Sequence, residues 1–405
     1  MKQPIDPVFF RFPGVFIVFL IFGGVAPAFL AGEPLYSPTW GFRMDLPEGY
    51  TYQSGNGKDR FSFRSDRNAV LDAAVYAGSA YPSIEALAAD TQKRLGNRGE
   101  TVFFEYQNKP AAILTLAFTA PNDGGRGAVY EGWGLCVELA GGGENAPPGA
   151  SPLLLALAYG PAGDGELANL HLSALDSIAP READRYAPGP ITEFTYPRGR
   201  PLTGTPAGLD LAVPFREFDA QGAQALVDRE FAVLRLYGDS PLWKEAWTRF
   251  YRAIYRDSFE RLAPAAFMLE RHWQAATAGT GETADGADRL LAEKALEWVQ
   301  SFSYERDLLG SDFVNLVSAV LEGRGDCDSR AMLWAIIMEQ ANIPAAIMVS
   351  AGYSHAMGLV DLDGTGARFP LAGNHWLVAE TTAPVPLGRI RADASEISQW
   401  LGIAF

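Results

Sequence analysis

The spacing of apolar residues changes once along this chain, and that change limits the folds it can adopt. Between Trp40 and Arg181, apolar and polar residues alternate in short runs, such as Arg60–Arg64 and Ala69–Tyr76, separated by turn residues. Alternation of this kind predicts β-strands. Beyond Pro206 the apolar residues recur every three or four positions, which predicts longer helices. The sequence therefore predicts an α+β protein with two differently built domains.

The first domain, expected over residues 33–185, combines strands with few helices. Ser83 precedes an apolar-periodic run and suits the N-cap of a helix at Ile84–Leu95. A short second helix is expected at Leu167–Ser177. Further strands are predicted at residues 101–106, 111–118, 127–139 and 153–158, with a loop rich in Gly and Pro at 141–152.

A second domain is expected over residues 207–405, after an extended linker rich in Pro and Gly at 186–206. A chain of 405 residues is long enough for two separate cores. The second domain begins with helices. An aromatic stripe from Trp243 to Tyr255 predicts a buried helix face, and Pro264 is expected to kink or end that helix. Another helix is predicted at Ala287–Phe302.

Residues 1–28 have the pattern of a signal peptide. Lys2 and Arg11 come before the apolar run Val15–Val25, and the small-residue site Ala26-Pro-Ala28 follows it. We expect cleavage after Ala28 and an extracytoplasmic protein, periplasmic or secreted. The alternative is an uncleaved signal that anchors the chain to the membrane, although the run is shorter than the roughly 20 apolar residues of a comfortable span.

The charge and the cysteine content exclude two classes of protein. A formal net charge of −15 and the absence of a Lys/Arg stripe argue against nucleic acid as a partner. The two cysteines, Cys136 and Cys327, are too few for a disulfide framework, and a free thiol in an oxidising compartment needs an explanation. We expect Cys136 to be a buried strand residue and not to bridge Cys327; a bridge between the two is the alternative.

The segment around Cys327 carries the strongest chemical signal. Gly323, Arg324, Gly325 and Asp326 form a turn that leads directly into an apolar-periodic helix beginning at Cys327. A helix amino terminus supplies unpaired N–H groups and the positive end of the helix dipole. These favour a thiolate and can stabilise an oxyanion, so Cys327 is the predicted nucleophile.

A thiolate nucleophile needs an imidazole base, and the chain contains four histidines. His171 falls in the first predicted domain, and His272 is interpreted as a helix residue at the solvent edge. His355 begins a strand-like run and is the predicted base, with His375, which begins the next strand, as the alternative.

A third group must orient the imidazole by accepting its other N–H. Glu380 is the predicted orienter, because a carboxylate in the apolar run that starts at Trp376 would be costly to bury without a partner. Asp361 and Asp363 are the alternatives, although their Gly-rich surroundings indicate the turn that joins the two strands.

Five phrases between Ala287 and Leu387 resemble the transglutaminase-like superfamily. They are Trp298-Val-Gln-Ser-Phe-Ser-Tyr304, Gly325-Asp-Cys-Asp-Ser-Arg-Ala331, Asn342-Ile-Pro-Ala345, Ser354-His-Ala-Met-Gly358 and Glu380-Thr-Thr382. The resemblance implies a papain-like α+β domain with a Cys-His-acid triad, here Cys327, His355 and Glu380. Many members have Asp where this chain has Glu380.

The start of the first domain, Trp40-Gly-Phe-Arg-Met-Asp-Leu-Pro-Glu-Gly49, together with the strand and helix order that follows, resembles exported domains related to PsbP. This resemblance covers about 140 residues and implies a binding or docking module. It carries over no functional residue.

The transglutaminase-like resemblance and the predicted signal peptide together imply an exported cysteine hydrolase or transamidase. It would act on peptide or carboxamide bonds through a thioester, without a cofactor or metal. The partner would be a protein or peptide substrate, with exported protein and cell-wall peptide both open. The competing hypothesis is a scaffold or binding protein of the cell envelope that keeps the fold while its triad is unused.

Overall fold

The computed structural model describes residues 34–405, except 79, 122–126, 140–150, 278–283 and 307–310. The predicted signal peptide lies outside the described residues. The chain divides into two compact units, Met1–Leu175 and Asp176–Phe405. Both contain strands and helices, which confirms the α+β class. No helix in the described part of the chain is long and apolar enough to cross a membrane.

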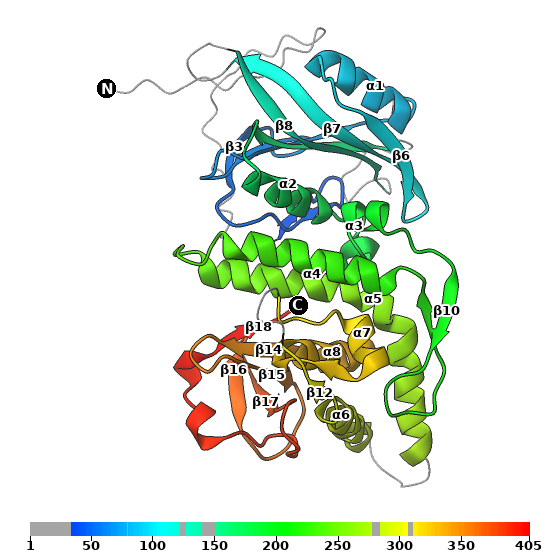
Figure 1. The fold of residues 1–405 in the computed structure, drawn as a ribbon, viewed down its shortest axis with the longest axis vertical. Coiled ribbons are helices and arrows are strands. Elements are labelled where there is room, and N and C mark those ends of the chain that lie inside the picture. Colours follow the sequence, from blue (N-terminus) through cyan, green and yellow to red (C-terminus); the bar gives the residue numbers. More distant parts are fainter. Residues whose placement is uncertain (1–33, 79, 122–126, 140–150, 278–283, 307–310) are drawn as a thin grey trace. The chain divides into compact units, whose positions relative to one another are not determined.

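Unit 1 is built on a seven-stranded antiparallel sheet (Figure 1). In sheet order its strands are β3 (Thr51–Gly55), β4 (Arg60–Arg64), β5 (Val70–Tyr76), β9 (Leu153–Pro161), β8 (Gly127–Glu138), β7 (Lys109–Pro121) and β6 (Thr101–Tyr106). Two short strands, β1 (Leu35–Tyr36) and β2 (Arg43–Met44), pair separately. The predicted alternating runs of this half all form strands.

Helix α1 (Ile84–Leu95) covers part of this sheet and begins at its predicted N-cap. Ser83 accepts a hydrogen bond from the Ala86 N–H, and Gly96 ends the helix with a left-handed φ of 56°. The α1 side chains Ile84 and Leu87 share a buried cluster with Cys136 of β8, which is fully buried and free, as expected. The second helix, α2 (Glu166–Asp176), ends where the two units divide.

The predicted extended linker over residues 186–206 does not have that conformation. The segment contains the short helix α3 (Pro190–Thr195) and strand β10 (Pro201–Gly204), and it belongs to unit 2. Pro190 occupies the first helical turn, where its missing N–H costs nothing. The N–H and hydroxyl of Thr192 both donate to the buried Asp176 carboxylate, which fixes α3 in place.

Before its five-stranded sheet, unit 2 consists mainly of helices. After the 3-10 turn η1 (Glu182–Tyr186), α3 and the hairpin of β10 with β11 (Val213–Arg216), it contains α4 (Asp219–Arg235), α5 (Trp243–Thr277), α6 (Ala284–Gln300), α7 (Leu316–Glu322) and α8 (Cys327–Gln340). The short strands β12 (Ser303–Tyr304) and β13 (Arg324–Gly325) pair in parallel.

Helix α5 does not end at Pro264 but continues to Thr277. A proline inside a helix removes one backbone hydrogen bond at a cost of about 3 kcal/mol. Here Leu262, Ala265 and Leu269, on either side of Pro264, are buried in the main core of unit 2. The packing of that face offsets the lost bond. Phe250 and Tyr255 from the aromatic stripe are buried in the same core, as predicted. Trp243, at the start of the stripe and of the helix, is exposed, so the prediction was wrong there.

The sheet of unit 2 has five antiparallel strands. In sheet order they are β16 (Arg368–Leu371), β17 (Asn374–Ala379), β15 (His355–Val360), β14 (Ala345–Ser350) and β18 (Leu401–Ile403), the last following two 3-10 turns, η2 (Ala392–Ala394) and η3 (Ile397–Gln399). All six residues of β14 are buried. The predicted pairing of the His355 and Trp376 strands is present, but their connection contains the additional strand β16.

Helix α8 lies in the middle of unit 2, and its residues from Ala331 to Met338 are almost fully buried. Its Trp334 indole packs directly on the backbone of Gly358 in β15, and the indole N–H donates to the carbonyl of Ala292 in α6. A side chain at Gly358 would collide with the indole ring. This close approach fixes the helix that begins at Cys327 against the strand that begins at His355.

Candidate active site

Cys327 is the first residue of α8, as predicted. The preceding helix α7 ends at Glu322 and is capped by Gly323, whose φ of 64° is in the left-handed region that favours glycine, so only residues 323–326 separate the two helices. Asp326 is the N-cap of α8: its Oδ1 accepts hydrogen bonds from the N–H of Ser329, at 2.8 Å, and from the Ser329 hydroxyl. This cap fixes the helix start and therefore the position of the sulfur.

His355 and Glu380 are in contact. His355 is the first residue of β15, and Glu380 directly follows β17. The Nε2 of His355 lies 2.8 Å from Oε2 of Glu380, and the other carboxylate oxygen accepts hydrogen bonds from the N–H and the hydroxyl of Thr382. Because Nε2 is engaged by the carboxylate, Nδ1 is the ring nitrogen left to accept a proton from another group.

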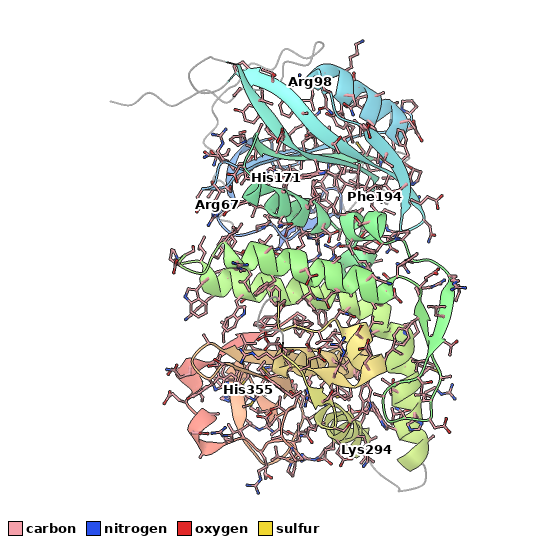
Figure 2. All side chains as sticks on the ribbon, in the orientation of Figure 1. Arg67, Arg98, His171, Phe194, Lys294 and His355 are labelled. Atoms are coloured by element: carbon pink, nitrogen blue, oxygen red, sulfur yellow. The ribbon has the colours of Figure 1, made fainter. Side chains whose placement is uncertain are left out.

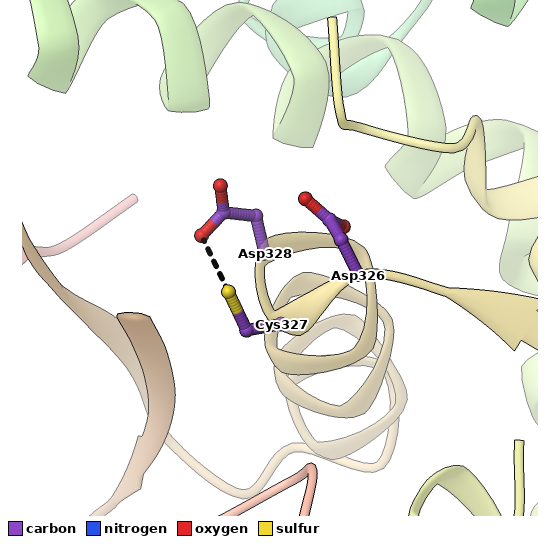
Figure 3. A group of neighbouring side chains, drawn as sticks. All are labelled: Asp326, Cys327 and Asp328. Carbon is purple, nitrogen blue, oxygen red and sulfur yellow. Dashed lines mark hydrogen bonds between the residues drawn. The ribbon is translucent and has the colours of Figure 1, made fainter. Parts of the chain in front are cut away.

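The hydrogen bond of the Cys327 thiol runs to a different residue. Its sulfur lies 3.7 Å from Oδ1 of Asp328 (Figure 3). The backbone N–H of Ala356, next to His355, and the hydroxyl of Tyr304 also lie within hydrogen-bonding reach of the sulfur. Within the described residues, no hydrogen bond joins Cys327 to His355. The predicted pair of His355 and Glu380 is thus formed next to the cysteine, but His355 does not hydrogen-bond to the sulfur.

The electrostatics of the cysteine differ from the sequence-based expectation. Burial raises the pKa of the Cys327 thiol above its ordinary value, and the charges of Asp328 and Asp326 raise it further. Donation from Ala356 and Tyr304 acts in the opposite direction but does not compensate. The helix amino terminus was expected to favour the thiolate; burial and the two flanking carboxylates act in the opposite direction and favour the neutral thiol.

Glu380 shows the opposite balance. Burial alone would raise the pKa of its carboxyl group, but the hydrogen bond and charge of His355, together with the Thr382 donors, lower it below the ordinary value. Glu380 is therefore ionised at neutral pH, and its Oε2 accepts the Nε2–H of His355. This arrangement leaves the lone pair on Nδ1, which suits His355 to act as a base.

The other residues considered from the sequence lie elsewhere. His375 is an exposed residue of β17 whose partner across the strands is Pro370 of β16. Asp361 and Asp363 lie in the loop after β15. His272 is in α5. Figure 2 labels His355 in unit 2 and His171 in unit 1. His171 is buried, and burial lowers its pKa to about 4.

Sequence reasoning missed three residues that contact the cysteine or its neighbour. Asp328 is adjacent to Cys327 and stood in the quoted motif without a role. Tyr304 stood at the end of another quoted phrase; the residue is 55% exposed, and its hydroxyl reaches the sulfur. Tyr251 of α5 donates its hydroxyl hydrogen to Asp328. No local signal identifies Tyr251, because it is also a buried member of the aromatic stripe.

Asp326, Cys327 and Asp328 form a group that could approach a cation, since one ligand atom of each lies within 4.8 Å of the others. All three already have protein partners, with Asp326 bonded to Ser329 and Asp328 accepting from both Cys327 and Tyr251. We assign no metal to this group, and the chemistry below uses the side chains alone.

No family model matches this chain, and no curated protein matches it. Among solved structures, a crystal structure from Bacteroides thetaiotaomicron VPI-5482 at 1.50 Å resolution is similar, with 7% sequence identity and a TM-score of 0.25. The match covers 83% of this chain and 88% of that one. A score this low supports no conclusion about fold or function, so the function has to be inferred from the site.

Proposed function

We propose that this protein is a transglutaminase-like cysteine hydrolase or transamidase, with Cys327 as nucleophile, His355 as base and Glu380 as orienter. The observation that carries the proposal is the 2.8 Å contact between His355 and Glu380. The backbone N–H of Ala356, the residue after His355, lies within hydrogen-bonding reach of the Cys327 sulfur at the start of α8. A nucleophile, a base and a group that orients the base are the parts that covalent acyl transfer needs.

In the first step the thiol proton of Cys327 passes to Nδ1 of His355 while the sulfur attacks the carbonyl carbon of a carboxamide or peptide bond. The C–N bond then breaks, and His355 returns the proton to the leaving nitrogen, which departs as ammonia or an amine. In the second step water or an amine attacks the thioester, His355 takes its proton, and the sulfur leaves and is reprotonated. Water gives hydrolysis and an amine gives transamidation.

The tetrahedral intermediate of each step carries an oxyanion that needs donors. Of the N–H groups at the start of α8, that of Ser329 donates to the Asp326 side chain and that of Arg330 to the Asp326 carbonyl. The N–H of Cys327 itself and the Tyr304 hydroxyl are the candidate donors. Each such donor contributes about 3 kcal/mol to transition-state stabilisation in other enzymes.

The proposal includes a transglutaminase-like fold for unit 2 and a PsbP-like one for unit 1. The antiparallel sheet with the cysteine helix packed on it supports the first, and the strand order with α1 after β5 supports the second. With export by the predicted signal peptide, the substrate would be an exported protein or a cell-wall peptide. No cofactor is part of the proposal.

The test is turnover of a glutamine-containing peptide in the presence of hydroxylamine, measured as ammonia release and peptide hydroxamate. The wild type should form both products and a thioester on Cys327 that mass spectrometry detects after acid quenching. Cys327→Ala and His355→Ala should form neither. Cys136→Ala is the matched control, because Cys136 lies in unit 1, and it should retain activity. Activity that survives Cys327→Ala refutes the proposal.

A second candidate is the scaffold with an unused triad. The thiol bonded to Asp328 and the raised pKa of Cys327 favour it. Labelling with iodoacetamide distinguishes the two. A scaffold should label Cys327 as slowly as the buried Cys136 and show no effect of His355→Ala, whereas an enzyme should label Cys327 faster and lose that advantage in His355→Ala.

A further inference from the structure

The partner of the Cys327 thiol in this structure is a carboxylate. Figure 3 shows the sulfur directed at Asp328, the next residue of α8, with Asp326 on the other side of the helix start. When the Asp328 carboxylate is ionised it can only accept the hydrogen of the thiol, so the contact is then made by the neutral S–H form. A base, by contrast, must take the proton away. Asp328 therefore accepts a hydrogen bond from the Cys327 thiol, whereas His355 would remove the thiol proton.

A second residue holds Asp328 in this position. The hydroxyl of Tyr251 donates to the Asp328 carboxylate, and Tyr251 is 1% exposed in the core between α5 and α8. A hydrogen-bond donor on a buried aromatic ring defines where the carboxylate lies more strictly than a mobile surface group would. Tyr251 is thus a positioning residue that acts on Cys327 through Asp328.

The groups around the sulfur come from every element packed against it. At the α8 start, burial raises the pKa of Asp326 to about 8 and also raises the pKa of Asp328, and the charge of Asp312 raises both further. The hydrogen bonds of Tyr251 and Cys327 act on Asp328 in the opposite direction, towards the ionised form. The hydroxyl of Tyr304 in β12 and the backbone N–H of Ala356 in β15 donate to the sulfur. His355 is close enough for its positive form to favour an ionised Asp328. Arg306 and Arg330 interact with the sulfur through their charges.

We propose that Asp328 controls the ionisation of Cys327: it accepts the thiol hydrogen in the resting site, keeps the sulfur neutral, and restrains attack until the proton moves to His355. The inference rests on the proposed function in naming Cys327 as nucleophile and His355 as its base. A carboxylate 3.7 Å from the sulfur opposes a second negative charge there, and removal of its charge should release the thiolate.

The test is the pH dependence of alkylation of Cys327 by iodoacetamide in the full chain, followed by peptide mass spectrometry. Asp328→Asn should lower the midpoint of the profile by about one pH unit or more. At pH 7.5 a shift of one unit should raise the rate by only about threefold, because a less basic thiolate is also less nucleophilic. A midpoint that is unchanged or higher in Asp328→Asn overturns the proposal.

Cys136 serves as the internal folding control, because it is fully buried and should label only in unfolded protein. Tyr251→Phe keeps the ring in the core and removes the donor, so its midpoint should move in the same direction by a smaller amount. The double variant should behave like Asp328→Asn alone. If Asp328→Asn does not fold, an unchanged midpoint in Tyr251→Phe overturns the proposal.

Asp363→Asn removes the same charge from the exposed loop after β15 and should leave the midpoint unchanged. An equal shift in that variant would mean that net charge, not the Asp328 contact, is responsible, and would overturn the proposal. Alkylation needs no substrate. A shifted midpoint without peptide turnover would therefore support the role of Asp328 and reject the proposed function. Peptide turnover with an unshifted midpoint would support the proposed function and reject the role of Asp328.

Discussion

Replacement of Gly358 by alanine tests the contact that joins α8 to β15. A Cβ at this position would lie 2.5 and 2.7 Å from two carbons of the Trp334 ring and 3.3 Å from the Cβ of Ala379. Carbon atoms in contact are normally about 3.5 to 4.0 Å apart, so the ring or the strand would have to move by about 1 Å. Trp334 is fully buried and bonded to Ala292, so it has no free space to move into.

Overpacking of this kind typically costs about 1 to 3 kcal/mol, and the rigid indole places Gly358→Ala at the upper end. For a unit of this size, a loss of about 2 to 3 kcal/mol corresponds to a fall in melting temperature of roughly 4 to 12 °C. The assay is thermal and urea unfolding followed by circular dichroism. Trp334→Phe should partly rescue Gly358→Ala, with a coupling energy of about 0.5 kcal/mol or more.

The control is Gly238→Ala, in the same unit, where the nearest atom to a new Cβ is the Arg235 carbonyl oxygen at an ordinary 3.7 Å. Its unfolding free energy should change by less than about 0.5 kcal/mol. Wild-type stability in Gly358→Ala, or equal losses in the two variants, would refute the close approach of Trp334 to β15 and with it the account of how the cysteine and the histidine are held together.

Three further outcomes are expected. Because the folded pKa of Glu380 is lowered, its carboxylate stabilises the fold above about pH 4.5 and loses that effect as the pH falls through the folded pKa. Glu380→Gln should therefore cost about 1.5 kcal/mol or more at pH 7, and melting curves should converge with the wild type near pH 3. Asp176→Ala leaves Arg229 buried with one acidic partner fewer and should cost about 3 kcal/mol in urea unfolding; less than 1 kcal/mol would contradict the buried network. Mass spectrometry of exported protein should find Phe29 at the amino terminus, and a retained Val15–Val25 segment would reject the signal peptide.

The elements with a clear period were predictable. Helix α1 and strands β4 and β6 have the predicted bounds, because alternation and a Ser N-cap are local properties. Pro264 was misread as a possible helix end because local propensity carries no information about the core that holds α5 together. Residues 186–206 were misread for the same reason: Pro190 suits a linker or a first helical turn equally, and only the buried Asp176 decides between them.

The candidate site was predictable in its residue types and order but not in its contacts. Cys327 at a helix start and the pair of His355 and Glu380 followed from motif and strand pattern. The Asp328 contact did not, because the direction of a cysteine side chain depends on which residues of α5 and β12 pack near it. Tyr251 lies 77 positions before Asp328, and nothing in the aromatic stripe distinguishes its hydroxyl from its neighbours.

Strand β14 has a consequence for handling the protein. All six of its residues are buried, and its pairing with β18 protects one of its two hydrogen-bonding edges. Without β18, the run Ala-Ala-Ile-Met-Val-Ser would present an uncharged, β-prone edge to other molecules, which is the pattern that promotes edge-to-edge aggregation. A chain truncated before Leu401 should therefore form insoluble aggregates, even though it retains all of the proposed catalytic residues.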